Sequence, residues 1–387
     1  MLGQYFRNSM KRGLVSLVRR PLLLIMMVVM PLLCAWFLLD LMSPGRVTRV
    51  PVGIVDLDNS SISRNLTRNL GALNAVNITA YNTFGEAKDA VQSGEIMGFF
   101  YIPADFSSKA LSGRKPKLSY YINYAWYTPA STQYQGFKTI TVLANGAIAK
   151  TALETAGLPD GKINASLQPI VTHVHGVNNP WTNYSYYLNM SFVPCLFALF
   201  VLLVTAFSIG TELKYGTSRE WLRTAGNSIE VAVTCKMVPQ TVIFWAVGLM
   251  VQFLMYRVYG LPLNCNPWHM IVAMLLFVLA NQGFALTIMC AVPNFRYGST
   301  LCTLLGMLSF SFCGFSLPQE AMYSWIEPLG FVMPVKYYFL LSVDQALNGM
   351  PLYYSRVYYA ALLGFTLLPW ALTWHLRREC RQPVYVP

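Results

Sequence analysis

Charged residues are scarce in this sequence. They make up 11% of the 387 residues, whereas hydrophobic residues make up 55%; soluble domains contain about 25% charged residues. The deficit is concentrated in long apolar runs, which excludes an ordinary soluble protein and indicates an integral membrane protein. The net charge of +12 comes largely from basic residues that flank these runs. We therefore assign it to membrane topology and expect no nucleic-acid partner.

Several site-forming patterns are also missing. None of the eight cysteines has a CxxC partner or zinc-ligand spacing, and none lies between residues 43 and 187. A segment of that length outside the cytoplasm must be stabilised by its core and not by disulfides. The phosphate-binding patterns GxxxxGKS and GxxxxGKT do not occur, so nucleotide hydrolysis needs another chain. We expect the N-terminal apolar run to be a retained span, because it is too long for a cleaved signal.

Six segments contain enough apolar residues to cross a bilayer, which takes about twenty per helix. They are residues 21–42, 188–210, 231–256, 268–292, 298–317 and 357–375. With both termini in the cytoplasm, thirteen basic residues lie inside, and the short outer loops hold only Arg257, Lys336 and Arg356. Basic residues flanking spans stay in the cytoplasm, so we expect both termini there and residues 43–187 outside.

The outer segment, residues 43–187, shows strand and helix patterns in alternation. Strand patterns begin near residues 50, 76, 95 and 116, and helical spacing occurs near residues 61–71, 84–94 and 130–157. A last strand is predicted at LQPIVTHVHGV. The predicted fold class is therefore a multi-span α-helical membrane protein with six transmembrane helices and an inserted extracytoplasmic α/β domain.

Two polar pairs in this domain resemble metal sites, and for each we favour a structural explanation. Asp56 and Asp58 follow a strand, but a helix cap within residues 59–61 explains this cluster without a metal. His173 and His175 share one strand face but are too few ligands for a metal site.

An aromatic run also lies in this domain. It favours a core strand with an edge at an interface, and contact with a substrate or partner stays open. The run comprises Tyr120, Tyr121, Tyr124, Trp126 and Tyr127.

The predicted cytoplasmic loop at residues 211–230 contains a short charged segment. It breaks at Gly216 and Thr217, and Ser218 begins a second short helix with Glu220 in its first turn. A short helix that joins two spans can dock into a cleft of a cytoplasmic partner. We predict this docking at Glu212, Leu213, Lys214, Tyr215, Gly216, Thr217, Glu220 and Leu222.

This loop resembles the coupling-helix motif of the ABC type-2 export permeases. In that motif an acidic residue precedes a Gly-Thr pair, and another acid and a leucine follow. Lys214 stands where many relatives carry an acid, so an electrostatic contact at this position is expected to differ. The leucine is followed by RTAG, where relatives usually show threonine and proline. The motif's roles would fall to Glu212, Gly216, Thr217, Glu220 and Leu222.

The resemblance extends along nearly the whole chain, including residues 50–66, 178–194 and 314–349. It implies an export permease of the bacterial inner membrane that pairs with a second copy or a related permease. ATP and Mg²⁺ would bind a separate ABC ATPase subunit, so the chain itself is expected to be no enzyme and to hold no cofactor. A periplasmic adaptor is a further candidate partner.

The resemblance also implies a division of the chain. It predicts an amphipathic elbow helix at residues 1–20, a first span at 21–42, the external domain at 43–187 and a five-span membrane domain at 188–387. Within the last part it places the coupling loop at 211–230 and an outer re-entrant segment at 317–350.

Polar residues at membrane depth are candidates for a substrate pathway. Such groups bond neighbouring helices or face a cavity, and both explanations stay open here. Charged residues lie only near span ends, which argues against a proton-coupled carrier and an ion channel. The resemblance places the path between the second and fifth spans, and an apolar, Met-rich lining favours a lipid, drug or other amphipathic substrate. The candidate residues are Asn281, Gln282, Ser309, Phe310, Ser311 and Phe312.

Two other functions are consistent with parts of the sequence. In the first, the chain is a membrane-anchored envelope receptor or adaptor-binding protein without transport, although a mere anchor has no need of the docking loop. In the second it is an intramembrane enzyme, which requires a convergent His, Asp, Glu or Cys cluster at membrane depth that the sequence does not suggest.

Overall fold

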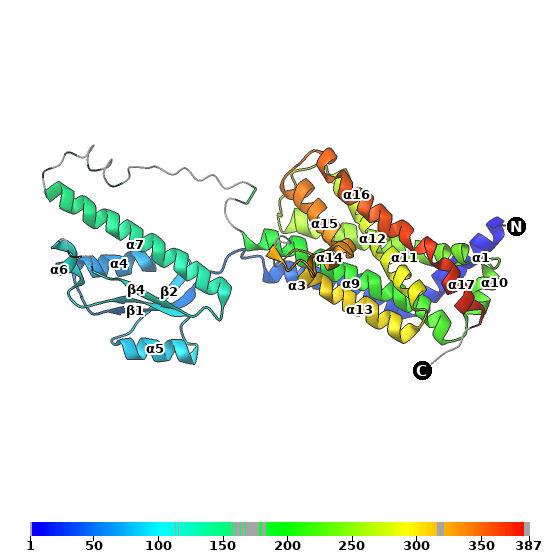
Figure 1. The fold of residues 1–387 in the computed structure, drawn as a ribbon, viewed down its shortest axis with the longest axis horizontal. Coiled ribbons are helices and arrows are strands. Elements are labelled where there is room, and N and C mark those ends of the chain that lie inside the picture. The colour runs from blue at the N-terminus through cyan, green and yellow to red at the C-terminus, as the bar shows by residue number, and fades with distance from the viewer. Residues whose placement is uncertain are drawn as a thin grey trace. The chain divides into compact units, whose positions relative to one another are not determined.

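The computed structural model describes residues 2–112, 116–155, 183–315 and 321–382, and single positions 114, 157, 159, 163, 167, 178 and 179. The chain forms two compact units. We call Arg46–His175 the sheet unit, and Met1–Gly45 together with Gly176–Pro387 the helical unit. Each is described by itself (Figure 1).

A four-stranded sheet organises the sheet unit, with strand order β2-β1-β3-β4. Strand β1 pairs in parallel with β2 and β3, and β4 pairs antiparallel with β3. Because β1 is central and covered on both faces, it has a nearly continuous apolar sequence. The strands are β1 (Val50–Asp56), β2 (Val76–Ala80), β3 (Gly98–Ile102) and β4 (Ser119–Ile122).

Helices cover both faces of this sheet (Figure 1). Helices α4 (Ser61–Gly71) and α7 (Tyr127–Thr155) pack on one face, over a core that includes Val52, Phe100 and Phe137. On the other face lies α5 (Phe84–Ser93), whose Ala87 packs with Val55 and Phe99. The short α6 (Phe106–Leu111) contacts α4 and α7.

Hydrogen bonds with nearby residues occupy the two aspartates that follow β1. Asp56 accepts from the N–H groups of Asp58 and Asn59, both at 3.0 Å, and Asp58 accepts from the N–H and hydroxyl of Ser107 at 3.3 Å. Partial burial raises the pKa of Asp58, but hydrogen bonds from Ser107 and Ser60 outweigh it and hold the pKa below its usual value.

Helix α4 begins at the cap expected within residues 59–61. The hydroxyl of Ser60 accepts a hydrogen bond from the Ser63 N–H at 3.1 Å. Among the described residues no group of three His, Cys, Asp or Glu side chains is placed to hold a metal. The pair His173 and His175 and the predicted strand around it lie almost entirely outside the described residues.

The aromatic run at the end of the sheet divides between core and surface. Tyr120 lies 5.6 Å from Phe137 between ring centroids, on the α7 face. Tyr121 stacks on Phe99 at 4.8 Å and is 45% exposed. The three residues that follow, Tyr124, Trp126 and Tyr127, are exposed.

The helical unit contains long helices interrupted by short turns of other helix types. Its N-terminal part comprises α1 (Leu2–Val18), α2 (Pro21–Leu24), η1 (Ile25–Val29) and α3 (Met30–Leu41). Its middle part comprises α9 (Tyr184–Lys214), α10 (Ser218–Thr224), α11 (Ile229–Phe253), η2 (Leu254–Val258), α12 (Pro267–Ala291) and α13 (Phe295–Phe312). The C-terminal part comprises α14 (Glu327–Phe331), α15 (Pro334–Ser342), η4 (Val343–Leu347), α16 (Leu352–Leu367), η5 (Leu368–Ala371) and α17 (Thr373–Arg381).

Five helical stretches of the described chain are long and apolar enough to cross a membrane. They match the predicted spans except the fifth, residues 298–317, which overlaps α13. This 18-residue helix has polar residues in its first two turns, including Arg296, and is less apolar than the others. The multi-span helical class is thus confirmed, and the sixth span stays a prediction. The five are Pro21–Leu41, Tyr184–Lys214, Ile229–Val258, Pro267–Ala291 and Leu352–Arg381.

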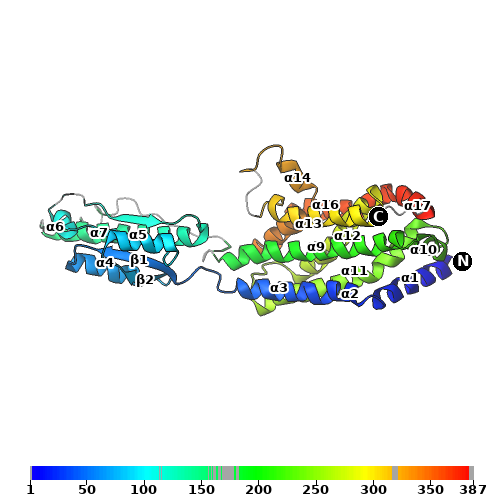
Figure 2. The ribbon, with the colours of Figure 1, turned by 90° about the horizontal axis from the view of Figure 1, so that it is seen from below.

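Helix α9 forms the centre of the helical unit. It packs against α3, α12, α13 and α15, and it lies among them in the ribbon views (Figure 2). Most of its side chains are buried, including Pro194 and Phe197. Phe277 of α12 stacks on Tyr338 of α15 with ring centroids 4.2 Å apart. Helix α9 therefore contacts several helices of the unit at once.

Gly283 of α12 lies against the backbone of α16, whereas Gly364 has open space beside it. A Cβ at Gly283 would lie 2.3 Å from the carbonyl oxygen of Phe365, whereas a Cβ at Gly364 meets nothing within 4 Å. Gly283→Ala is expected to lower the free energy of unfolding by about 1–3 kcal/mol, because the backbones must separate. Gly364→Ala is expected to leave it unchanged or raise it by up to about 1 kcal/mol. Thermal unfolding in detergent checks both, and equal losses would contradict this packing.

Candidate functional site

The eight residues predicted to contact a partner lie where α9 ends and α10 begins. Helix α9 continues to Lys214, so Glu212 and Leu213 belong to its last turn. Gly216 has φ +69°, in the left-handed region that glycine adopts readily, and its N–H donates to the Leu213 carbonyl at 3.2 Å. This glycine ends α9 and redirects the chain into α10.

Burial divides these eight residues into three groups. Tyr215 is 64% exposed, and Gly216 and Glu220 are also exposed. Lys214 and Thr217 are half-buried. The side chains of Glu212, Leu213 and Leu222 are buried and are not available to a partner in this structure. Their contact with a partner stays a prediction, and in this structure their side chains pack inside the junction.

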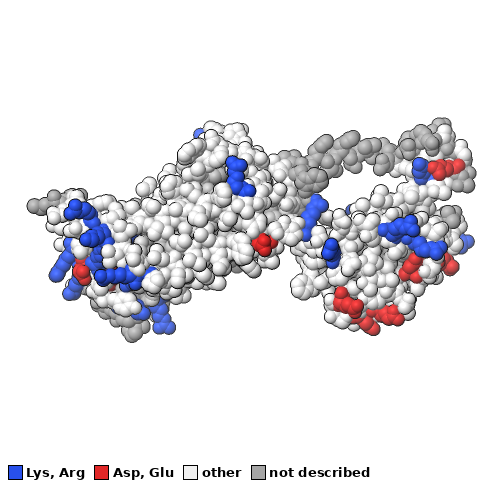
Figure 3. Space-filling view, turned by 180° about the vertical axis from the view of Figure 1, so that it is seen from behind, with Lys and Arg blue, Asp and Glu red and all other residues white. Residues whose placement is uncertain are grey.

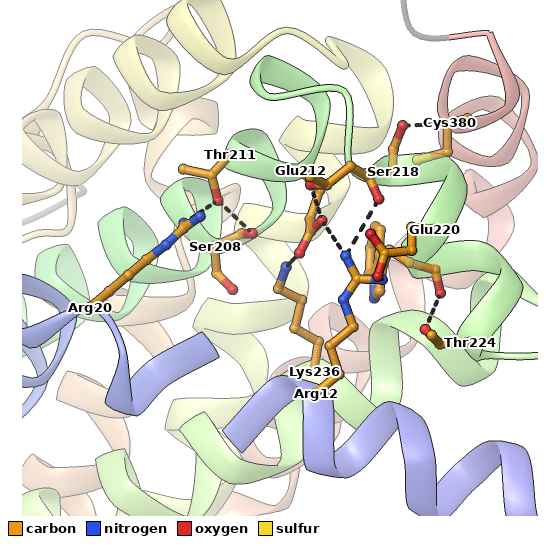
Figure 4. A network of polar contacts seen from close by, with 12 residues as sticks. Arg12, Arg20, Ser208, Thr211, Glu212, Ser218, Glu220, Thr224, Lys236 and Cys380 are labelled. Atoms are coloured by element: carbon orange, nitrogen blue, oxygen red, sulfur yellow. Dashed lines mark hydrogen bonds and ion pairs between the residues drawn. The ribbon is translucent and has the colours of Figure 1, made fainter. Parts of the chain in front are cut away.

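Glu212 forms the centre of a buried ion-pair network (Figure 4). Its Oε1 accepts from Nζ of Lys236 in α11 at 2.6 Å. Its Oε2 lies 3.3 Å from Nη2 of Arg12 in α1 and also accepts from the Thr217 hydroxyl. One carboxylate thus joins α1, α9, α11 and the turn before α10. We call Arg12, Glu212, Thr217 and Lys236 the brace.

The brace differs in burial from the ion pair beside it. The side chains of Glu212 and Lys236 are 9% and 7% exposed, so neither charge is well solvated. Glu220 also approaches Arg12, at 3.8 Å, but it is 72% exposed. An exposed ion pair contributes about 0–1 kcal/mol to the free energy of unfolding. Removing one partner of a buried pair lowers that free energy by about 3–5 kcal/mol. Stability at this junction therefore depends on Glu212 far more than on Glu220.

Helix α10 is held by contacts on its buried side. Trp221 is 2% exposed, and the Lys236 ammonium lies 4.9 Å from its ring centroid, within cation–π range. The hydroxyl of Ser218 donates to the Cys380 carbonyl at 3.1 Å, and Nε of Arg219 donates to the Arg381 carbonyl at 2.9 Å. These bonds tie α10 to α17 and leave the side with Glu220 and Arg223 facing outward.

A comparison with protein families found a match over most of the chain. The family described as ABC-2 family transporter protein matches residues 21–375, which include all of α9 and α10. The chain belongs to this family. A comparison with curated proteins found no match. As an ABC-2 permease, the chain is a multi-pass membrane subunit of an ABC transporter, and its family implies an ABC ATPase as partner.

Two residues that shape the permease's α9–α10 junction were missed by sequence reasoning. Arg12 was counted only among the thirteen basic residues expected in the cytoplasm, and Trp221 was not singled out. Arg12 and Glu212 are 200 residues apart in the chain. The available signal was a single acid, Glu212, at the end of an apolar run among many basic residues. A buried acid of that kind requires a cation.

The polar residues of α12 that were predicted to line a pathway are buried in the permease, and each forms a side-chain hydrogen bond. Asn281 donates to the Phe277 carbonyl of its own helix at 2.8 Å. Gln282 accepts from the Thr241 hydroxyl of α11 at 2.7 Å. Both side chains are fully buried. These contacts match the alternative explanation, bonding within and between helices.

The four predicted pathway residues of α13 differ in exposure. Ser309 is buried and donates to the Leu305 carbonyl at 2.9 Å. Phe310 and Phe312 are half-buried, and the ring of Phe310 lies 5.8 Å from that of Phe192 in α9. Ser311 is exposed. Phe310, Ser311 and Phe312 are therefore the accessible candidates in this structure, whereas Ser309 is buried like Asn281 and Gln282.

Proposed function

We propose that this ABC-2 permease is the membrane subunit of an ATP-driven exporter of the bacterial inner membrane, with both termini in the cytoplasm. Its substrate is a hydrophobic or amphipathic molecule such as a lipid, a drug or an envelope component. The observation that carries the proposal is the braced junction between α9 and α10. Its exposed residues offer a partner a docking surface, which we define as Tyr215, Gly216, Arg219, Glu220 and Arg223.

The brace explains how movement of a docked partner reaches the membrane. A push on α10 acts on α9 through Thr217 and Glu212, and on α1 and α11 through Arg12 and Lys236. Buried side chains in ion pairs do not separate freely, because separation leaves an unpaired charge. The four elements therefore move together. The ATPase partner binds ATP and Mg²⁺, and this chain transmits the partner's movement to its membrane helices.

The contact between α9 and α13 is the proposed site of substrate passage. These two helices pack along each other, and Phe310, Ser311 and Phe312 lie at the end of α13. A second permease copy or a related permease supplies the opposite wall. When α9 moves with the brace, its contact with α13 changes, which opens or compresses the path. An aromatic lining suits an amphipathic substrate better than an ion.

A receptor function is the second candidate, and one observation favours it. Tyr124, Trp126 and Tyr127 of the sheet unit are 55%, 60% and 71% exposed, as in a binding surface for a periplasmic adaptor or another envelope protein. A receptor that is merely anchored does not need a brace linking α1, α9 and α11 to an exposed turn. We therefore favour transport and assign the aromatic residues to an adaptor.

The test is transport in vesicles that contain the permease and the ATPase that co-purifies with it from native membranes. The vesicles are loaded with a fluorescent cationic amphiphile as the probe. We expect ATP-dependent movement of the probe, and none with a hydrolysis-deficient ATPase. Equal movement with and without ATP, or an ATPase that never co-purifies, would favour the receptor function.

A further inference from the structure

A basic pocket lies between α17 and the first turn of α11. Its volume is about 370 Å³, whereas a water molecule occupies about 30 Å³ of liquid. The pocket therefore has room for a phosphate group with attached glycerol. Lys and Arg gather at this end of the helical unit, with few acids among them (Figure 3). The lining residues are Glu230, Thr373, Trp374, Arg377, Arg378, Arg381 and Gln382.

The charges in this pocket favour an anion. Three arginines face one carboxylate, and Glu230 is already hydrogen-bonded to the Ser228 hydroxyl at 2.7 Å. Arg377 donates to the Asn227 carbonyl at 3.0 Å, which orients its guanidinium group. Its Nε is buried and has no hydrogen-bond partner among the described residues. Within the same described part of the chain, Arg378 and Arg381 form no ion pair.

The position of the pocket along the helices indicates where its ligand comes from. Helix α17 ends the membrane-spanning stretch Leu352–Arg381, and α11 begins the stretch Ile229–Val258. Two spans therefore reach the membrane surface beside the pocket. Trp374 is 63% exposed there, and tryptophan is enriched at the level of lipid headgroups. Basic pockets between spans at this depth suit anionic headgroups.

We infer that this pocket binds the phosphate of an anionic phospholipid. Arg378 and Arg381 donate to the phosphate oxygens, for which guanidinium groups have a matching forked geometry. Trp374 packs against the glycerol and the first methylenes. The inference depends on neither the orientation of the chain nor the proposed transport, because the pocket is defined within the helical unit alone.

A bound lipid would also hold α17 against α10. The carbonyls of Cys380 and Arg381 in α17 accept from Ser218 and Arg219 of α10. Lipid binding at Arg381 therefore stabilises the end of the helix that supports α10. The lipid composition of the membrane would thereby influence how firmly the docking surface is held.

The experiment measures lipid binding to the purified full-length chain in phosphatidylcholine nanodiscs, by titration of phosphatidylglycerol with native mass spectrometry. We expect the double variant Arg378→Gln/Arg381→Gln to bind phosphatidylglycerol roughly 30-fold more weakly than the wild type. The control Arg7→Gln/Arg296→Gln removes the same charge from exposed arginines outside the pocket. We expect it to change binding by less than about threefold. Unfolding midpoints in phosphatidylcholine verify that both variants are folded, and Arg378→Lys/Arg381→Lys is the fallback if the glutamine variant is not.

Other outcomes overturn the inference. Equal weakening by both double variants would mean that general surface charge attracts the lipid. Displacement of phosphatidylglycerol by millimolar inorganic phosphate would mean a site for soluble phosphate compounds. If Arg378→Gln/Arg381→Gln loses the ATPase while lipid binding is unchanged, the pocket belongs to a protein interface.

Discussion

Replacing Glu212 by alanine is expected to lower the free energy of unfolding by about 3–5 kcal/mol. In the wild type the Lys236 ammonium lies 2.6 Å from the Glu212 carboxylate, and its side chain is 7% exposed. The substitution leaves this buried ammonium without an anion. Arg12 loses its buried partner as well. Denaturant or thermal unfolding of the purified permease in detergent measures the loss. We expect less folded protein in the membrane for the same reason.

The matched control is Glu220→Ala, which removes the same charge from the same junction. Glu220 is 72% exposed and lies 3.8 Å from Arg12, so the expected loss is below about 1 kcal/mol. Combining Glu212→Gln with Lys236→Met removes both buried charges and is expected to restore most of the stability. Equal losses at Glu212 and Glu220 would show that the brace does not carry the stability of this junction.

Replacing Gly216 by valine is expected to reduce ATP-dependent transport about tenfold. Gly216 has φ +69°. This left-handed conformation costs a residue with a side chain roughly 1–2 kcal/mol, and the cost is highest for a β-branched residue such as valine. A Cβ at this position meets nothing within 4 Å, so backbone conformation and not crowding causes the effect. The altered turn misplaces α10 relative to α9. Transport and ATPase stimulation in proteoliposomes measure the change.

Gly216→Asn is the control for this prediction, because asparagine tolerates the left-handed conformation. We expect it to retain most of the transport and to bind the ATPase normally. If asparagine and valine impair transport equally, the glycine acts through its small size at the partner surface and not through its backbone conformation.

Local patterns predicted much of the architecture. The apolar runs indicated the five spanning stretches, but two of them extend well beyond their predicted ends: α9 by four residues at each end, and Leu352–Arg381 by five and six. These ends are polar or aromatic, and hydropathy alone cannot separate a span from a helix that continues into water. Strand patterns near residues 50, 76, 95 and 116 correspond to β1 to β4. Strand order and parallel pairing depend on contacts between distant segments and were not specified.

The position of the turn was predicted from the sequence, whereas the burial of Glu212 was not. A charged helix with a Gly-Thr break indicated a turn between spans, and the structure has it at Gly216. Sequence reasoning assigned Glu212 to partner contact because it lies in a short charged loop segment that resembles the coupling-helix motif. Its burial depends on Arg12 and Lys236, which are brought together only by the packing of α1 and α11 on α9. Gln282 was ambiguous for the same reason, since its hydrogen-bond partner Thr241 comes from another helix.

The most direct test of the account is capture of the ATPase from native membranes by the solubilised permease. The test variant is Tyr215→Ala/Glu220→Ala, which alters only exposed side chains of the docking surface. The control is Tyr323→Ala, a tyrosine that is 75% exposed in the segment predicted to lie on the outer side. We predict that the wild type and the control retain the ATPase and that the test variant loses most of it while staying folded. Retention by the test variant at the wild-type level would contradict docking at the α9–α10 junction.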